Sequence, residues 1–116
     1  MLTKYHIKYY SSRTHRTDNA TLIHDGRPAD VVNEFFDTHP EAIRVYQVFK
    51  KLGRSARTSH GIYRVNAGNT ARVIEADSAQ EAASVVESQT GLPATATWKL
   101  VMAHRPHRGR DMLVEA

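Results

Sequence analysis

The chain contains no cysteine, which excludes disulfides, thiol nucleophiles and cysteine-ligated zinc. It also lacks any apolar run near the roughly 18 residues that a membrane-spanning helix needs, so we expect no membrane association. The start of the chain alternates like a strand and shows neither the apolar segment nor the cleavage site of a secretory signal. These absences lead us to expect a cytoplasmic protein.

Acidic residues are missing from three long stretches of the chain. Residues 1–17, 42–74 and 88–110 contain no Asp or Glu, yet they hold fifteen of the sixteen Lys and Arg residues. Most acids lie in 18–41 and 75–87, the two stretches that also contain the helix-like sequence. Because the charges are sorted along the chain and the net charge is +4, we expect an electropositive side that attracts polyanions.

Motifs for catalysis and cofactor binding are also absent. There is no nucleophile elbow, no glycine-rich phosphate loop and no H-E-x-x-H pattern. The most enzyme-like segment, 25–28, is better explained by a glycine turn and a proline helix start. His104 and His107 lie among arginines, which repel a metal cation, while His6 and His24 would meet only if the strand register allowed it. We predict no catalytic residue, no cofactor and no metal site, and hence no enzyme.

The order of predicted elements is the same in the two halves of the chain: two strands, a helix and a strand. Polar and apolar residues alternate with the two-residue period of strands at the start of each half. The six predicted strands cover 4–10, 20–23, 43–49, 62–65, 70–74 and 95–102. Pairs of strands joined by polar turns indicate hairpins, and the apolar stripes between them indicate helices that pack on the sheet.

The ends of both helices carry recognisable signals. Pro28 is suited to the first turn of the first helix, and Pro40 ends it. Ser78 and Glu81 have the S-x-x-E spacing of a capping box, which predicts the start of the second helix. Gly91 is suited to the left-handed residue that closes that helix.

Together these patterns predict an α+β fold and a single domain over 1–116. It would consist of tandem ββαβ halves, roughly 1–50 and 60–104, and a basic C-terminal tail over 104–116. The expected sheet is mainly antiparallel, with two helices packed on one face. Its exposed edges would allow two copies to pair as a homodimer, which the sequence neither requires nor excludes.

The candidate binding residues are basic side chains on strands and loops. We expect Tyr5, Ile7 and Tyr9 to point into the core, which leaves the intervening basic residues on the outer side of the sheet. Backbone phosphates would be neutralised by these side chains and by two basic loops. The predicted nucleic-acid-binding residues are Lys8, Lys50, Lys51, Arg54, Arg57, Arg64, Arg72, Arg105, Arg108 and Arg110.

The second half of the chain, from Tyr63 to Gly91, resembles a small ββα pattern common in accessory proteins of phages and plasmids. The resemblance implies a mobile-element accessory protein and assigns no residue a role. Our leading hypothesis is a noncatalytic nucleic-acid-binding or regulatory protein that uses a basic sheet and loop surface. The alternative is a protein-interaction module or inhibitor, encoded by a phage or plasmid, that acts on a host complex. DNA, RNA and an acidic protein all remain open as the polyanion.

Overall fold

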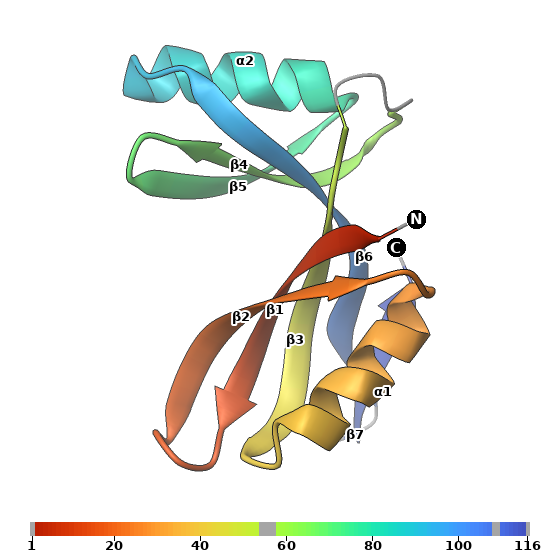
Figure 1. Ribbon diagram of the computed structural model, residues 1–116. Coiled ribbons are helices and arrows are strands. Elements are labelled where there is room, and N and C mark those ends of the chain that lie inside the picture. The colour runs from red at the N-terminus through yellow and green to blue at the C-terminus, as the bar shows by residue number, and fades with distance from the viewer. Residues whose placement is uncertain (1, 54–57, 108–109, 116) are drawn as a thin grey trace. The chain divides into compact units, whose positions relative to one another are not determined.

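The computed structural model describes residues 2–53, 58–107 and 110–115, with side chains described as far as residue 103. The chain forms seven strands and two helices in these residues (Figure 1). In chain order they are β1 (Thr3–Ser11), β2 (Arg16–His24), α1 (Pro28–Thr38), β3 (Ala42–Lys51), β4 (Gly61–Ala67), β5 (Thr70–Ala76), α2 (Ala79–Thr90), β6 (Ala94–His107) and β7 (Arg110–Glu115).

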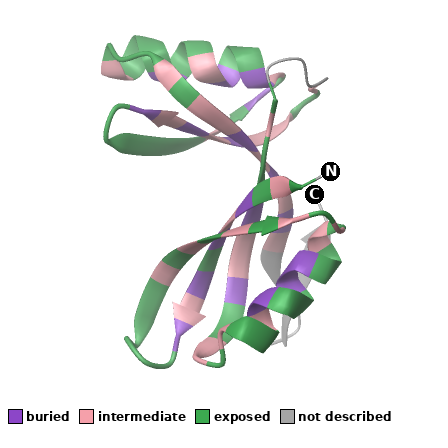
Figure 2. Cartoon of the chain, viewed as in Figure 1, coloured by how far each residue is buried: buried purple, intermediate pink, exposed green. Residues whose placement is uncertain are grey.

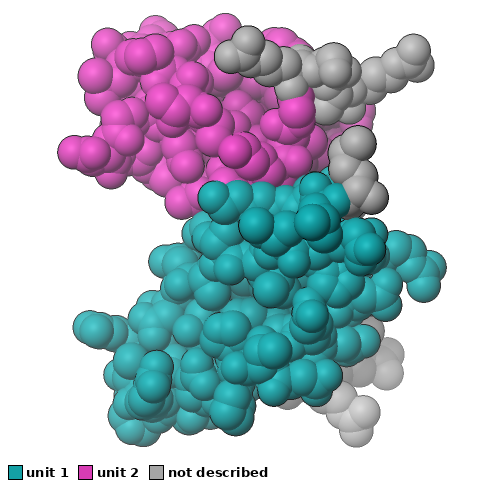
Figure 3. Space-filling view, in the orientation of Figure 1, with its two compact units in different colours: residues 1–50, 101–116 teal, residues 51–100 magenta. Residues whose placement is uncertain are grey.

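The chain divides into two compact units, shown separately coloured in Figure 3. Unit 1 comprises residues 1–50 and 101–116, and unit 2 comprises residues 51–100. Strand β6 contributes its first part to unit 2 and its last part to unit 1. Each unit has its own hydrophobic cluster and its own helix, so each is described separately below.

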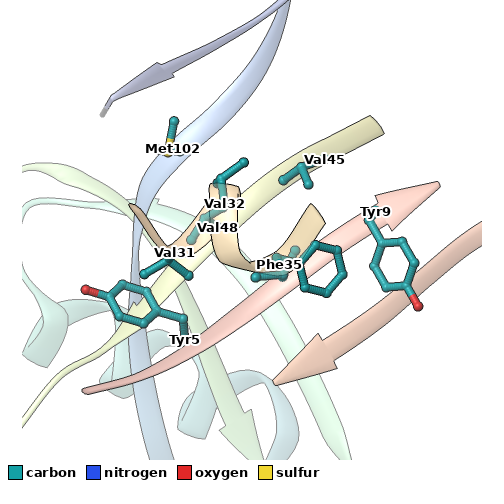
Figure 4. Packing of buried hydrophobic residues seen from close by; sticks show 9 residues of the cluster. Tyr5, Tyr9, Val31, Val32, Phe35, Val45, Val48 and Met102 are labelled. Carbon is teal, nitrogen blue, oxygen red and sulfur yellow. The ribbon is translucent and has the colours of Figure 1, made fainter. Parts of the chain in front are cut away.

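In unit 1, helix α1 packs on the strands through an apolar stripe. Val31, Val32 and Phe35 are buried against Tyr5 and Tyr9 of β1 and against β3 residues, as the close-up in Figure 4 shows. The Tyr9 and Phe35 rings meet edge to face at 4.9 Å, a favourable aromatic geometry. The predicted inward side of β1 is therefore confirmed, and alternate residues of β1 point to the opposite side of the sheet.

In unit 2, helix α2 covers β4 and β5 with smaller side chains. Ala79, Ala82 and Val86 of the helix pack against Tyr63 and Val65 of β4. Figure 2 shows this buried side of α2 alternating with exposed helical positions. The smaller helical residues bring α2 into contact with the strands in the same way as the larger ones in α1.

Both helices begin and end where the sequence predicts. Helix α1 starts at Pro28, and its last residue comes two positions before Pro40. The Ser78 hydroxyl accepts a hydrogen bond from the Glu81 amide (3.1 Å) at the start of α2. The capping box is modified, because the Glu81 carboxylate accepts from the Asp77 amide (2.9 Å). Gly91 closes α2 at φ 71°, in the left-handed region.

The predicted α+β class with a mainly antiparallel sheet is confirmed. The elements also follow the order ββαβ twice, with β7 added, although a true duplication of the halves stays a prediction. The backbone forms the last part of β6 and all of β7 where we expected a basic tail over 104–116. Hydrogen bonding between these two strands satisfies backbone groups that a tail would leave to water.

Candidate nucleic-acid interface

The side of the unit 1 strands opposite α1 gathers basic, polar and aromatic side chains in rows. In a ladder of paired strands, residues directly opposite one another share a face. Tyr10 of β1 lies between Thr17 of β2 and Arg44 of β3. The next row places Lys8 between two amide side chains, Asn19 and Gln47.

The rows farther from the β1–β2 turn are more apolar. His6 lies between Thr21 and Phe49, and its ring centroid is 6.2 Å from that of Phe49. Lys4 is opposite the exposed Ile23. We call this side of the strands the basic face. Its strand positions are Lys4, His6, Lys8, Tyr10, Thr17, Asn19, Thr21, Ile23, Arg44 and Gln47, joined by Tyr46 and bordered by the buried Phe49.

Tyr46 joins the basic face because β3 is irregular at this point. The pairing of β1 with β3 shifts between Lys8 and Tyr9, so Lys8 faces Gln47 whereas Tyr9 faces Val45. One extra β3 residue, Tyr46, is thereby accommodated, as in a β-bulge. The shift keeps Val45 in the core and adds an aromatic ring beside Gln47 on the opposite side.

The electrostatics of the two sides of unit 1 differ. No strand position of the basic face carries Asp or Glu, and within the described residues Lys4 and Lys8 are exposed and form no ion pair. On the side of α1, by contrast, several basic groups lie beside acids. His24 Nε2 is 3.2 Å from Glu34, and Arg27 is 4.0 Å from Asp30. The charge sorting of the sequence thus becomes a separation between two sides of one unit.

A shallow hollow of about 330 Å³ lies within the basic face. It is lined by a cation, a hydroxyl, an aromatic ring, an amide and a methyl group from four strands: Lys8, Thr17, Tyr46, Gln47 and Ala103. Its volume is at the lower end of the range for small-molecule sites. Because none of the described lining residues carries a carboxylate, the hollow suits an anionic or neutral polar group.

The described basic residues of unit 2 do not form one surface. Arg64 is half-buried on the side away from α2, with its guanidinium 5.8 Å from the centre of the Trp98 ring, and burial lowers the Arg64 pKa. Arg72 is opposite the core residue Val65 and donates to Gln89 of α2 at 3.1 Å. Arg64 and Arg72, both among the predicted binding residues, therefore lie on opposite sides of the unit 2 strands, because their register positions differ by one residue.

The other predicted binding residues are dispersed or lie outside the described side chains. Lys50 is opposite Tyr5 in the β1–β3 register, which places it on the α1 side of unit 1. Lys51 belongs to unit 2 and lines a second hollow, of about 510 Å³, together with Ala79, Ala83 and other small residues. Arg54, Arg57 and Arg108 lie outside the described residues, and Arg105 and Arg110 are described only as backbone of β6 and β7.

Sequence reasoning omitted Lys4, Arg44 and Gln47 from the predicted site. Lys4 could have been predicted from the sequence, because its spacing from Lys8 on β1 is a multiple of the two-residue strand period. The sequence did not indicate that Arg44 and Gln47 share a face, because they are three residues apart and would lie on opposite sides of a regular strand. Only the irregularity at Tyr46 brings them to the same side.

The histidines do not assemble a metal site in the described part of the chain. His6 is opposite Thr21 and His24 is opposite Thr3, so the two histidines lie on opposite sides of the hairpin. His24 instead accepts a hydrogen bond from the Gly26 amide (2.7 Å). Within the described residues, no group of three or more His, Asp or Glu side chains is placed to hold a metal ion.

Comparisons with protein-family models, curated proteins and solved structures found no match to the chain. Among the described residues, neither helix has the length and apolar character needed to cross a membrane. The fold and the site therefore define the protein only as an α+β protein with a basic sheet face on which no described side chain is a carboxylate. Its function has to be argued from that face.

Proposed function

We propose that the protein is a noncatalytic nucleic-acid-binding protein and that the basic face of unit 1 contacts the ligand. The observation that carries this proposal is the combination of exposed Lys4 and Lys8 with tyrosine side chains on a face without carboxylates. Lysines neutralise phosphates, and aromatic rings stack on bases. Protein ligands also bind through sheet faces, but a carboxylate-free face with unpaired lysines favours a polyanion.

The spacing of the face suits an extended chain of phosphates. Lys4 and Lys8 are four residues apart on one strand, or about 13 Å, and Arg44 lies on the neighbouring strand one row beyond Lys8. Three cations distributed in this way follow a line along β1 instead of clustering around one point. A polymer with regularly spaced negative charges fits such a line better than a small anion does.

The test is a fluorescence-anisotropy titration with labelled single- and double-stranded oligonucleotides at several salt concentrations. The Lys4→Ala/Lys8→Ala protein removes two charges from the basic face. We expect weaker binding and a slope of log K against log salt that is smaller by about 2, or about 1 for each lost phosphate contact.

A matched control removes the same charge from the other side of unit 1. Arg16 is opposite Ser11 and Lys50 is opposite Tyr5, so both lie on the α1 side, and both are exposed. The Arg16→Ala/Lys50→Ala protein should keep most of the wild-type affinity and salt slope. Equal losses in the two double variants, or no binding by the wild-type protein at low salt, would overturn the proposal.

A further inference from the structure

We propose that the hollow lined by Lys8, Tyr46 and Gln47 is a nucleotide subsite that accepts one unpaired base. This inference rests on the proposed function and narrows its ligand to single-stranded nucleic acid. The residues that line the hollow come from four different strands of unit 1, and three of them complement the chemical groups of a nucleotide. A nucleotide has a flat π-face, a hydrogen-bonding edge and a negative phosphate.

Each of these groups has a counterpart in the hollow. The Tyr46 ring offers an aromatic surface for stacking, which is tolerant of base identity. The Gln47 amide has two donors and an acceptor, so it can pair with the edge of a base. Lys8 is directly opposite Gln47 in the β1–β3 register, which places its ammonium within reach of the phosphate of the same nucleotide.

The geometry favours an unpaired base over a duplex. A base in a double helix is stacked on both faces and paired along its edge, so it cannot enter a hollow of about 330 Å³ without being extruded. Single strands present their bases at no such cost. The sheet face around the hollow is also extended, since rows of side chains along β1 repeat every two residues, or about 6.7 Å.

The polar side chains around the hollow extend the site toward the β1–β2 turn. Thr17 lines the hollow and is directly opposite Tyr10, and Tyr10 is opposite Arg44. A strand that places one base against Tyr46 would therefore run past a second ring and a second cation in the next row. Tyr10 itself is not part of the lining, which makes it a suitable comparison residue.

The experiment compares substitutions of these two tyrosines. Anisotropy titrations would use short homopolymer single strands of each base and a duplex of equal length. We expect the wild-type protein to prefer single strands and Tyr46→Leu to lower single-strand affinity about tenfold, as for one lost stack. Tyr46→Phe should retain the affinity, and Tyr10→Leu should lose less than Tyr46→Leu. Thermal melts of each variant verify that it is folded.

Two further measurements make the test independent of affinity alone. Gln47→Leu should reduce the difference in affinity among the four homopolymers while leaving the salt slope unchanged, because it removes an amide and no charge. A 2-aminopurine base in the strand should be quenched by the wild-type and Tyr46→Phe proteins and much less by Tyr46→Leu.

The outcomes separate this inference from the proposed function. Tighter binding to single strands, with losses specific to Tyr46→Leu and Gln47→Leu, supports the subsite. Equal binding to single strands and duplex, with Tyr46→Leu behaving as wild type, overturns the subsite but leaves nucleic-acid binding by the basic face intact. Failure of the wild-type protein to bind any oligonucleotide overturns the proposed function and the subsite together.

Discussion

At the scale of single residues, local side-chain contacts fix the turns that hold the strands in register. Gly68 occupies the β4–β5 turn at φ 59°, and an added Cβ would come within 2.6 Å of the Leu92 side chain. The left-handed conformation alone costs other residues about 1–2 kcal/mol. The backbone conformation is therefore the main reason for glycine at this position, because the exposed Leu92 side chain can move away from an added Cβ.

Gly68→Ala should lower the free energy of unfolding by about 1–2 kcal/mol, because alanine is strained in the left-handed backbone conformation. Urea denaturation measures this change. Gly53→Ala is the matched control, because nothing lies within 4 Å of the added Cβ and its φ is outside the left-handed region. Similar stabilities for the two variants would show that Gly68 is not under this constraint.

His60 provides a second contact that depends on protonation. Its Nδ1 is 2.8 Å from the Asp77 carboxylate and its Nε2 is 3.7 Å from Glu75. The hydrogen bond to Asp77, aided by the nearby negative charges, raises the His60 pKa above its ordinary value of 6.5. A raised pKa in the folded protein means that the stabilisation is complete below about pH 6.5 and is lost as pH rises through the folded pKa.

Asp77→Asn should therefore lower the His60 pKa toward 6.5, and its stability deficit should be largest below that pH and shrink above it. An NMR titration of the imidazole protons measures the pKa, and urea denaturation at several pH values measures the deficit. Asp37→Asn removes an equal charge from unit 1 and should leave the His60 titration where it is. A shift of the same size in both variants would contradict the direct contact.

At the scale of elements, the helix ends are set by a few hydrogen bonds that can be removed one at a time. The Ser78 hydroxyl satisfies the Glu81 amide at the start of α2, a position where helices leave amides without internal partners. Helix α1 uses a different device, because Arg27 and Asp30 interact around Pro28. The two helices thus start by different chemistry although they occupy equivalent places in the element order.

Ser78→Ala should destabilise the protein by about 1 kcal/mol through loss of the cap. Thermal or urea unfolding measures the loss. Ser84→Ala is a matched change at an exposed position inside α2, where alanine is the better helix former, so it should be neutral or slightly stabilising. The capping role would be refuted if Ser78→Ala proved no worse than Ser84→Ala.

At the scale of the whole molecule, each unit places a central strand between two neighbours. In unit 1, β1 pairs with both β2 and β3; in unit 2, β4 pairs with both β5 and β6. Strands β2 and β5 each have a single partner within the described residues and are more exposed. Buried central strands open only with their whole core, whereas edges can fray.

Amide hydrogen exchange should consequently be slowest at Ile7 and Val65, which are completely buried in the two cores, and faster along β2 and β5. Exchange followed by NMR on the intact chain measures every strand at once. The exchange rates of the β2 amides that are hydrogen-bonded to β1 can be compared directly with those of the amides in β1. Protection along β2 and β5 equal to that of β1 and β4 would contradict the assignment of edges.

Some of this molecule was predictable from the residues themselves. The inward positions of β1 followed from strict alternation, and the ends of α2 followed from Ser78 and Gly91, because these signals act over a few neighbouring residues. The candidate site was less predictable. Arg64 and Lys50 looked as accessible as Lys8, but one lies over Trp98 and the other on the α1 side.

The amino-acid sequence by itself determined the α+β class, the order of elements and the sorting of charge, since these depend on local periodicity and composition. Only the tertiary structure decided which charges share a face. Strand register and the shift at Tyr46 determine this, and a displacement of one residue moves a side chain to the opposite side of the sheet. Residues from the acid-free stretches of the chain thus share the basic face in unit 1, whereas in unit 2 Arg64 and Arg72 lie on opposite sides of the strands.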